Sequence, residues 1–139
     1  MSFEEKSTWA VLFTFLLVYG WYFLQVSAAV SSQDVASVEY QALMGVTVAA
    51  LIGISIVTHI AIAILSPDDA DKSDERDREI NVRGEYIGGF VVSTTALVAM
   101  ILAMLELAHF WIANALLLGL VTAELVTDCI KIYYYRRGF

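Results

Sequence analysis

Four ionisable side chains stand inside long apolar stretches of the sequence. They are His59, Glu106, Glu124 and Asp128. If those stretches cross a membrane, their charged residues are costly to bury and are functional candidates by default. Glu124 and Asp128 are four residues apart and share one helical face, and His59 has a similar predicted depth. We predict one cluster that relays protons, binds a cation or joins helices by hydrogen bonds. The alternative is that Lys131 reaches back from the membrane surface and pairs with Asp128.

A second group of polar residues surrounds the short turn between the last two apolar stretches: Glu106, His109 and Asn114. Glu106 and His109 supply two metal ligands at most, fewer than protein metal sites use. A haem shared by His59 and His109 is excluded, because their predicted depths differ by more than about 20 Å. A metal at this turn stays undecided, and no cofactor is predicted.

Motifs of several enzyme classes are absent from the sequence. It has no His-Glu-x-x-His, no Gly-x-Ser-x-Gly, no phosphate-binding loop and no Cys-x-x-Cys. The single cysteine, Cys129, excludes an internal disulfide. A net charge of −7 argues against nucleic acid as a ligand. A membrane enzyme is therefore only the third function that we consider.

A charged segment, residues 66–85, separates the second and third apolar stretches. Ser73 is a typical N-cap and precedes acids that suit the first turn of a helix. Two acid-to-base pairs have helical i, i+4 spacing: Asp74 with Arg78, and Glu79 with Arg83. We predict a helix that begins near Asp74 and runs into the third apolar stretch. Gly84, Gly88 and Gly89 are expected to loosen or kink it.

This charged helix has three interpretations. It is a solvated helix held by its own ion pairs, a docking surface for a partner, or a weak divalent-cation site at Asp68, Asp69 and Asp71. The acids do not match the spacing of a calcium-binding loop. The docking surface would consist of Asp74, Glu75, Arg76, Asp77, Arg78, Glu79 and Arg83.

The elements that position these residues follow from composition. The chain has 139 residues, of which 59% are hydrophobic and 17% are charged, whereas soluble domains carry about 25% charged residues. Apolar runs at about 8–30, 43–65, 86–107 and 110–134 have the length of roughly 20 residues that a transmembrane helix needs. We predict a single all-α domain, residues 1–139, forming an integral membrane four-helix bundle.

The basic residues predict how the bundle is oriented. All eight lie in the N-terminal tail, the charged segment or the C-terminal end: Lys6, Lys72, Arg76, Arg78, Arg83, Lys131, Arg136 and Arg137. The positive-inside rule therefore puts both termini in the cytoplasm, with the third helix extended into it. We interpret Trp21, Tyr22 and Trp111 as aromatic anchors at the outer membrane boundary.

Small residues at four-residue spacing predict close helix contacts. One row is Gly45, Ala49 and Gly53, and another is Ala115, Gly119 and Ala123. The third and fourth stretches are joined by a very short turn and are predicted to form an antiparallel hairpin. The first stretch carries bulky Phe13, Phe15, Tyr19 and Phe23. We expect it at the periphery or in a contact between two copies of the chain.

Three short segments resemble a group of small, uncharacterised bacterial membrane proteins. They are residues 74–80, with Arg83-Gly84 and Ile87-Gly88 after them, residues 109–114, and residues 135–138. The first reads DERDREI, the second HFWIAN and the third YRRG. The resemblance covers mainly the second half of the chain. It implies a multi-pass location in the bacterial inner membrane, and it brings no activity with it.

Two functions from different classes follow from these observations. The first is a non-catalytic accessory or regulatory subunit that binds a partner through residues 74–83. The second is a small oligomeric channel or transporter for protons or cations that uses Glu124, Asp128 and His59. The expected partners are the lipid bilayer, a cytoplasmic or membrane protein, and a second copy of the chain. Partner, transported species and oligomeric state are open at this point.

Overall fold

Four long helices make up the computed structural model, which describes residues 3–65 and 75–137. They are α1 (Phe3–Ser32), α2 (Gln41–Leu65), α4 (Glu75–Met104) and α5 (His109–Arg137). A short 3-10 helix, η1 (Val35–Ser37), connects α1 to α2, and no strand occurs in the described ranges. Ser73, Asp74 and the three acids Asp68, Asp69 and Asp71 lie outside the described residues.

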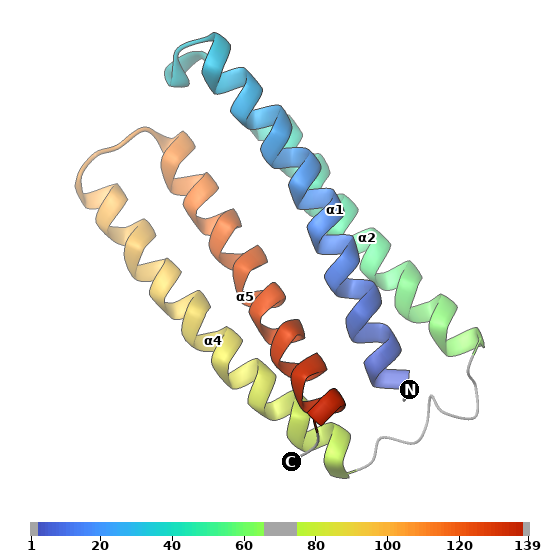
Figure 1. Ribbon diagram of the computed structural model, residues 1–139. Coiled ribbons are helices and arrows are strands. Elements are labelled where there is room, and N and C mark those ends of the chain that lie inside the picture. Colours follow the sequence, from blue (N-terminus) through green and yellow to red (C-terminus); the bar gives the residue numbers. More distant parts are fainter. Residues whose placement is uncertain (1–2, 66–74, 138–139) are drawn as a thin grey trace.

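The helices alternate in direction, so both chain ends lie at the same end of the molecule (Figure 1). We call this end, where α1 and α4 begin, the terminal end. The opposite end, which holds residues 33–40 and 105–108, is the turn end. Each of the four helices is long and apolar enough to cross a membrane. The all-α fold with four apolar helices is therefore confirmed.

Charged helix formers extend the helices beyond the apolar runs at the terminal end. α1 begins with Glu4 and Glu5 in its first turn, and α4 has Glu75 in its first turn. α5 has Arg136 and Arg137 in its last turn. Acids at helix N-termini and bases at C-termini are both favoured by the helix dipole. The predicted charged helix therefore exists from Glu75 onward and is continuous with the third apolar stretch.

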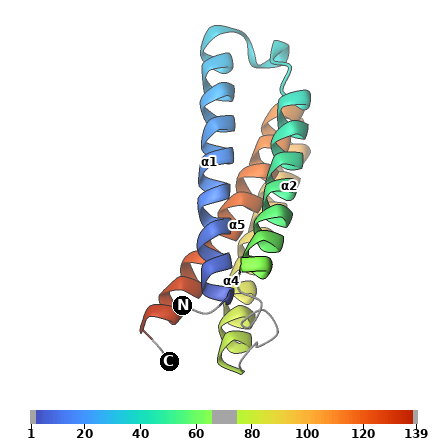
Figure 2. The ribbon, with the colours of Figure 1, turned by 90° about the vertical axis from the view of Figure 1, so that its right-hand side faces the viewer.

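The four helices form two pairs, α1 with α2 and α4 with α5. α5 makes extensive contacts with α4 and also packs on α1, while α2 packs mainly on α1. Figures 1 and 2 show the α1–α2 pair next to the α4–α5 hairpin. Of the two alternatives for α1, the peripheral one is wrong, because Tyr22 and Val26 belong to the core. A contact between two copies of the chain stays a prediction, and Phe13 and Phe23 point outward.

The core is small and lies toward the turn end. It consists of Tyr22, Val26, Val38, Leu51, Phe110, Leu117 and Val121. The rings of Tyr40 and Phe110 meet edge to face there, with centroids 5.3 Å apart. Large apolar side chains are exposed along all four helices. Such a surface is expected of a protein whose solvent is lipid.

Glycines allow α4 and α5 to approach each other closely. A Cβ added at Gly84 would lie 2.9 Å from the Lys131 Cγ, and one at Gly88 would collide with the Thr127 hydroxyl. A Cβ at Gly119 would collide with Thr95. The expectation that Gly84 and Gly88 loosen α4 is corrected: α4 is continuous through them, and they are contact points of the predicted hairpin.

The row of small residues on α2, Gly45, Ala49 and Gly53, makes no close helix contact within the described residues. Added Cβ atoms at Gly45 and Gly53 would meet nothing within 4 Å, and Ala49 is exposed. The buried residues of α2, Thr47 and Leu51, lie on its other side. The row therefore faces away from the rest of the chain.

The connection between α4 and α5 is a helix-ending turn with one residue in the left-handed region. Glu106 has φ 54°. Its N–H donates to the carbonyl of Ala103, and the N–H of Leu107 donates to that of Leu102. This is the Schellman pattern, in which glycine is the usual residue at the left-handed position.

Candidate functional site

The two acids of α5, Glu124 and Asp128, are one helical turn apart and share a face of that helix. Glu124 also lines a groove between α5 and α4, together with Glu85, Gly88 and Lys131. Asp128 is 3% exposed, and its Oδ2 has no hydrogen-bond partner among the described residues. Glu124 is half-buried. This acid pair combines a buried carboxyl group with one open acceptor position.

His59 does not join the acid pair. It is exposed on α2, where its Nδ1 lies 2.9 Å from the carbonyl of Ser55 one turn earlier. Its neighbour Thr58 is on the half-buried side of α2, and successive residues of a helix are turned by about 100°. No three His, Cys, Asp or Glu side chains in the described ranges come together as a metal site.

Lys131, which the alternative interpretation pairs with Asp128, forms its described salt bridge with another acid. Its Nζ lies 3.9 Å from Glu85 Oε1, so it bridges α5 to α4. The reason is the close α4–α5 contact, which holds the Lys131 stem over Gly84.

Buried polar residues at the terminal end tie α1 to the hairpin. Glu5 is buried, and its Oε1 lies 3.7 Å from the Arg136 Nε. The Arg136 guanidinium also lies over the Trp9 ring, 5.9 Å from its centre. The Asn81 amide donates to Glu4 Oε2 at 3.5 Å. We did not single out Glu5 from the sequence, because it stands in a charged N-terminal tail where burial leaves no signal.

The beginning of α4 has one face fixed against α5. Asp77, Ile80 and Gly84 are buried there. The Arg76 guanidinium donates to the carbonyl of Tyr135 at 3.4 Å, and the Arg83 guanidinium lies 5.6 Å from the centre of the Tyr134 ring. Asp77 is therefore not part of the predicted docking surface, because it is buried on the side of α4 that faces α5.

The opposite face of the same segment is exposed. Its residues recur at helical spacing: Glu75, Arg78, Glu79, Val82 and Tyr86. We call this surface the α4 stripe. Val82 is 58% and Tyr86 79% exposed. The predicted ion pair between Glu79 and Arg83 is confirmed, with an N–O distance of 2.9 Å. The stripe thus mixes charges of both signs with two exposed apolar side chains.

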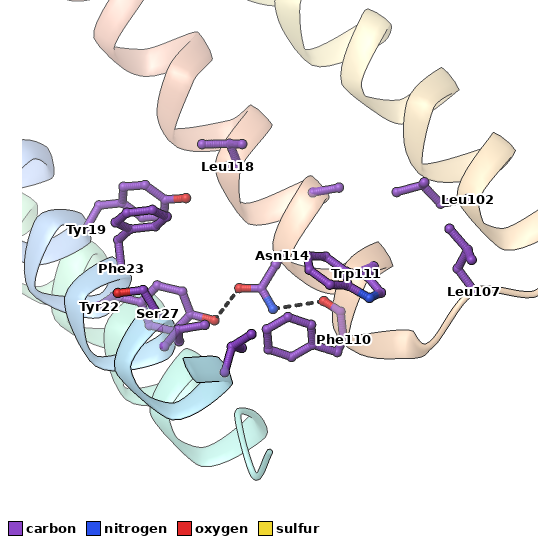
Figure 3. Close-up of a pocket in the computed structure, with 13 residues that line it drawn as sticks. Tyr19, Tyr22, Phe23, Ser27, Leu102, Leu107, Phe110, Trp111, Asn114 and Leu118 are labelled. Atoms are coloured by element: carbon purple, nitrogen blue, oxygen red, sulfur yellow. Dashed lines mark hydrogen bonds between the residues drawn. The ribbon is translucent and has the colours of Figure 1, made fainter. Parts of the chain in front are cut away.

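A lateral cavity of about 570 Å³ lies at the turn end, between α1 and the hairpin (Figure 3). Its polar floor is a hydrogen-bonded pair. The Tyr22 hydroxyl donates to Asn114 Oδ1 at 2.7 Å, and the Asn114 amide donates to the carbonyl of Phe110 at 2.8 Å. Tyr22 is 1% exposed, so it is a core residue rather than the predicted surface anchor.

The polar residues of the predicted outer group are not gathered. Asn114 lines the cavity, whereas Glu106 and His109 are exposed and do not line it. Glu106 ends α4, and His109 begins α5. Sequence reasoning missed the Tyr22–Asn114 pair because it joins residues 92 positions apart.

No family model, no curated protein and no solved structure matches this chain. Three features of the molecule itself are therefore candidates for function: the α4 stripe, the acid pair and the lateral cavity.

Proposed function

We propose that the chain is a non-catalytic integral membrane protein that binds a partner protein through the α4 stripe, as an accessory or regulatory subunit. The extent of exposed apolar surface on all four helices supports insertion into a bilayer. The resemblance of residues 74–80, 109–114 and 135–138 supports the bacterial inner membrane as the location.

The charges support a cytoplasmic location for the terminal end. The described basic residues all lie near that end: Lys6, Arg76, Arg78, Arg83, Lys131, Arg136 and Arg137. Cytoplasmic flanks of membrane helices are enriched in Lys and Arg. The α4 stripe then faces the cytoplasm, with Tyr86 at the membrane surface.

The observation that carries the proposal is that residues 75–86 of α4 have one packed face and one exposed face. One face is held against α5 by buried Ile80 and Gly84, while the other exposes Val82 and Tyr86 among charges. A rigid surface loses little freedom on binding, which favours affinity. Aromatic residues are enriched at the centres of protein interfaces, with charges at their rims.

Photocrosslinking in intact cells tests this docking surface. A photoreactive amino acid at Val82 should give one discrete adduct with a partner, and the same group at Leu105, exposed at the turn end, should not. Arg78→Glu should abolish the Val82 adduct, while Arg137→Glu, an exposed reversal outside the stripe, should leave it intact. Adducts that are equal at Val82 and Leu105, or that are unaffected by Arg78→Glu, would contradict the proposal.

A second candidate function is proton or cation conduction in an oligomer. The buried Asp128, one oxygen of which has no hydrogen-bond partner in residues 3–65 and 75–137, and Glu124 on the same face favour it. In liposomes with a pH gradient, Glu124→Gln and Asp128→Asn should each abolish flux. His59→Ala should not, because that side chain is exposed and apart from the acids. Wild-type liposomes that are no leakier than empty ones would remove this candidate.

A further inference from the structure

The lateral cavity at the turn end has the size and openness of a ligand site. Its volume of about 570 Å³ falls within the range of about 300–1,000 Å³ that is typical of small-molecule sites. Four exposed side chains form its rim: Phe23, Leu107, Trp111 and Leu118. In a membrane, this rim would lie at the outer boundary, where Phe23 and Leu118 reach the hydrocarbon and Trp111 lies at headgroup level.

The walls of the cavity are aromatic and uncharged. Five of the described lining residues are aromatic: Tyr19, Tyr22, Phe23, Phe110 and Trp111. None of the described lining residues is ionised at neutral pH. The site therefore has no cation for a phosphate headgroup, but it has ring faces and edges against which a flat ring can pack.

The polar groups of the cavity can still bind oxygen atoms of a ligand. A carboxamide has two N–H donors, and Asn114 uses one on the Phe110 carbonyl. The second N–H, together with the hydroxyl of Tyr19 and the indole N–H of Trp111, can donate to carbonyl oxygens. In Figure 3 the Tyr19, Asn114 and Trp111 side chains come from two helices that face each other across this space.

We propose that this cavity binds an isoprenoid quinone, which has an uncharged flat ring, carbonyl oxygens and an apolar chain. The ring would lie among the aromatic walls near Asn114, and the chain would leave over the rim into lipid. A plain acyl chain gains little, because it leaves surroundings that are as apolar as the cavity. The hydrogen-bond donors at Tyr19, Trp111 and Asn114 would make the affinity for a quinone higher than that for an acyl chain. The proposal concerns binding only and is independent of the α4 stripe, although it shares the membrane location.

Fluorescence quenching of Trp111 tests the proposal. Trp9→Phe and Trp21→Phe leave Trp111 as the only tryptophan. Titration with decylubiquinone in detergent micelles should quench its emission saturably. Ala115→Phe, which fills the cavity wall, should weaken binding at least about 10-fold, since a ring added to a packed site displaces the ligand. Ala103→Phe, at an exposed position of α4 outside the cavity, should not change it.

A second variant tests the amide of Asn114 separately, and its helix content is compared with that of the parent protein because it also loses the Tyr22–Asn114 hydrogen bond. Asn114→Leu keeps the volume but removes the amide, and it should weaken decylubiquinone binding roughly 10-fold, the effect of one lost hydrogen bond in a buried site. Quenching that rises linearly without saturation, or that saturates at the same decylubiquinone concentration in the parent protein, Asn114→Leu and Ala115→Phe, would overturn the proposal. Displacement of the quinone by diacylglycerol at equal concentration would also overturn it and would identify a general lipid groove.

Discussion

Tyr22 and Asn114 join α1 to α5 through a single hydrogen bond in surroundings that are otherwise apolar. Groups in such surroundings cannot turn to water when their partner is lost, so the bond contributes more than its exposed equivalent. Asp128 is the contrasting case, because its Oδ2 has no such partner in the described ranges. The Tyr22–Asn114 pair uses its polar atoms to join two helices, whereas Asp128 Oδ2 keeps an unused acceptor position within the described ranges.

Loss of the Tyr22 hydroxyl should therefore destabilise the protein measurably. We expect Tyr22→Phe to lower the free energy of unfolding by about 1–2 kcal/mol, because Asn114 Oδ1 loses its donor. The measurement is unfolding of the reconstituted protein by a denaturing detergent. Tyr19→Phe is the control, since its half-buried hydroxyl makes no described hydrogen bond. Equal effects of the two variants would show that the Tyr22–Asn114 bond contributes nothing.

Glu106 should be replaceable by glycine with a gain in stability. Its φ of 54° is strained for an L-residue by roughly 1 kcal/mol. Glu106→Gly should raise the unfolding midpoint, and Glu106→Val should lower it, because β-branching makes that conformation worse. The opposite order of the two midpoints would mean that the carboxylate itself has a function at the turn.

At the scale of the elements, α4 and α5 form a unit whose contacts are set by small residues. The hairpin and the row of Ala115, Gly119 and Ala123 could be predicted from the sequence, because a short turn forces antiparallel neighbours and small residues permit close approach. Gly84 and Gly88 were predicted as weak points in α4, since a glycine in a charged helix has the same local signal whether or not another helix covers it.

The predicted cluster of His59 with Glu124 and Asp128 also depended on which face of a helix is packed, and the sequence does not show this. The depth of a residue follows from its position along a helix, at about 1.5 Å per residue. The direction in which its side chain points depends on which face of the helix is packed. In α2 the packed face is the one that carries Thr47 and Leu51. For this reason the pairing of Glu124 with Asp128, which lie on one helix, could be predicted, whereas the addition of His59 from another helix could not.

Gly88 and Gly89 give a matched test of the hairpin contact. Alanine at Gly88 would collide with the Thr127 hydroxyl, whereas alanine at Gly89 would meet nothing within 4 Å. Gly89→Ala should stabilise the protein by up to about 1 kcal/mol through helix propensity. Gly88→Ala should be less stable than Gly89→Ala by about 1–3 kcal/mol because of overpacking. Similar unfolding midpoints for the two variants would contradict the α4–α5 register.

At the scale of the whole molecule, the two ends differ in chemistry. The terminal end holds the described bases, the buried Glu5 and Asp77, and the α4 stripe. The turn end holds the aromatic cavity and no described basic residue. The proposed membrane orientation accounts for this division, because ionised side chains are costly within a bilayer and are expected at one of its surfaces.

Labelling of single cysteines with a membrane-impermeant maleimide tests this division most directly. In a Cys129→Ser background, Ser37→Cys reports on the turn end and Val82→Cys on the α4 stripe, and both positions are exposed. In intact spheroplasts we predict that Ser37→Cys is labelled at once and that Val82→Cys is labelled only after the membrane is permeabilised. Labelling of both positions from the same side would contradict the account.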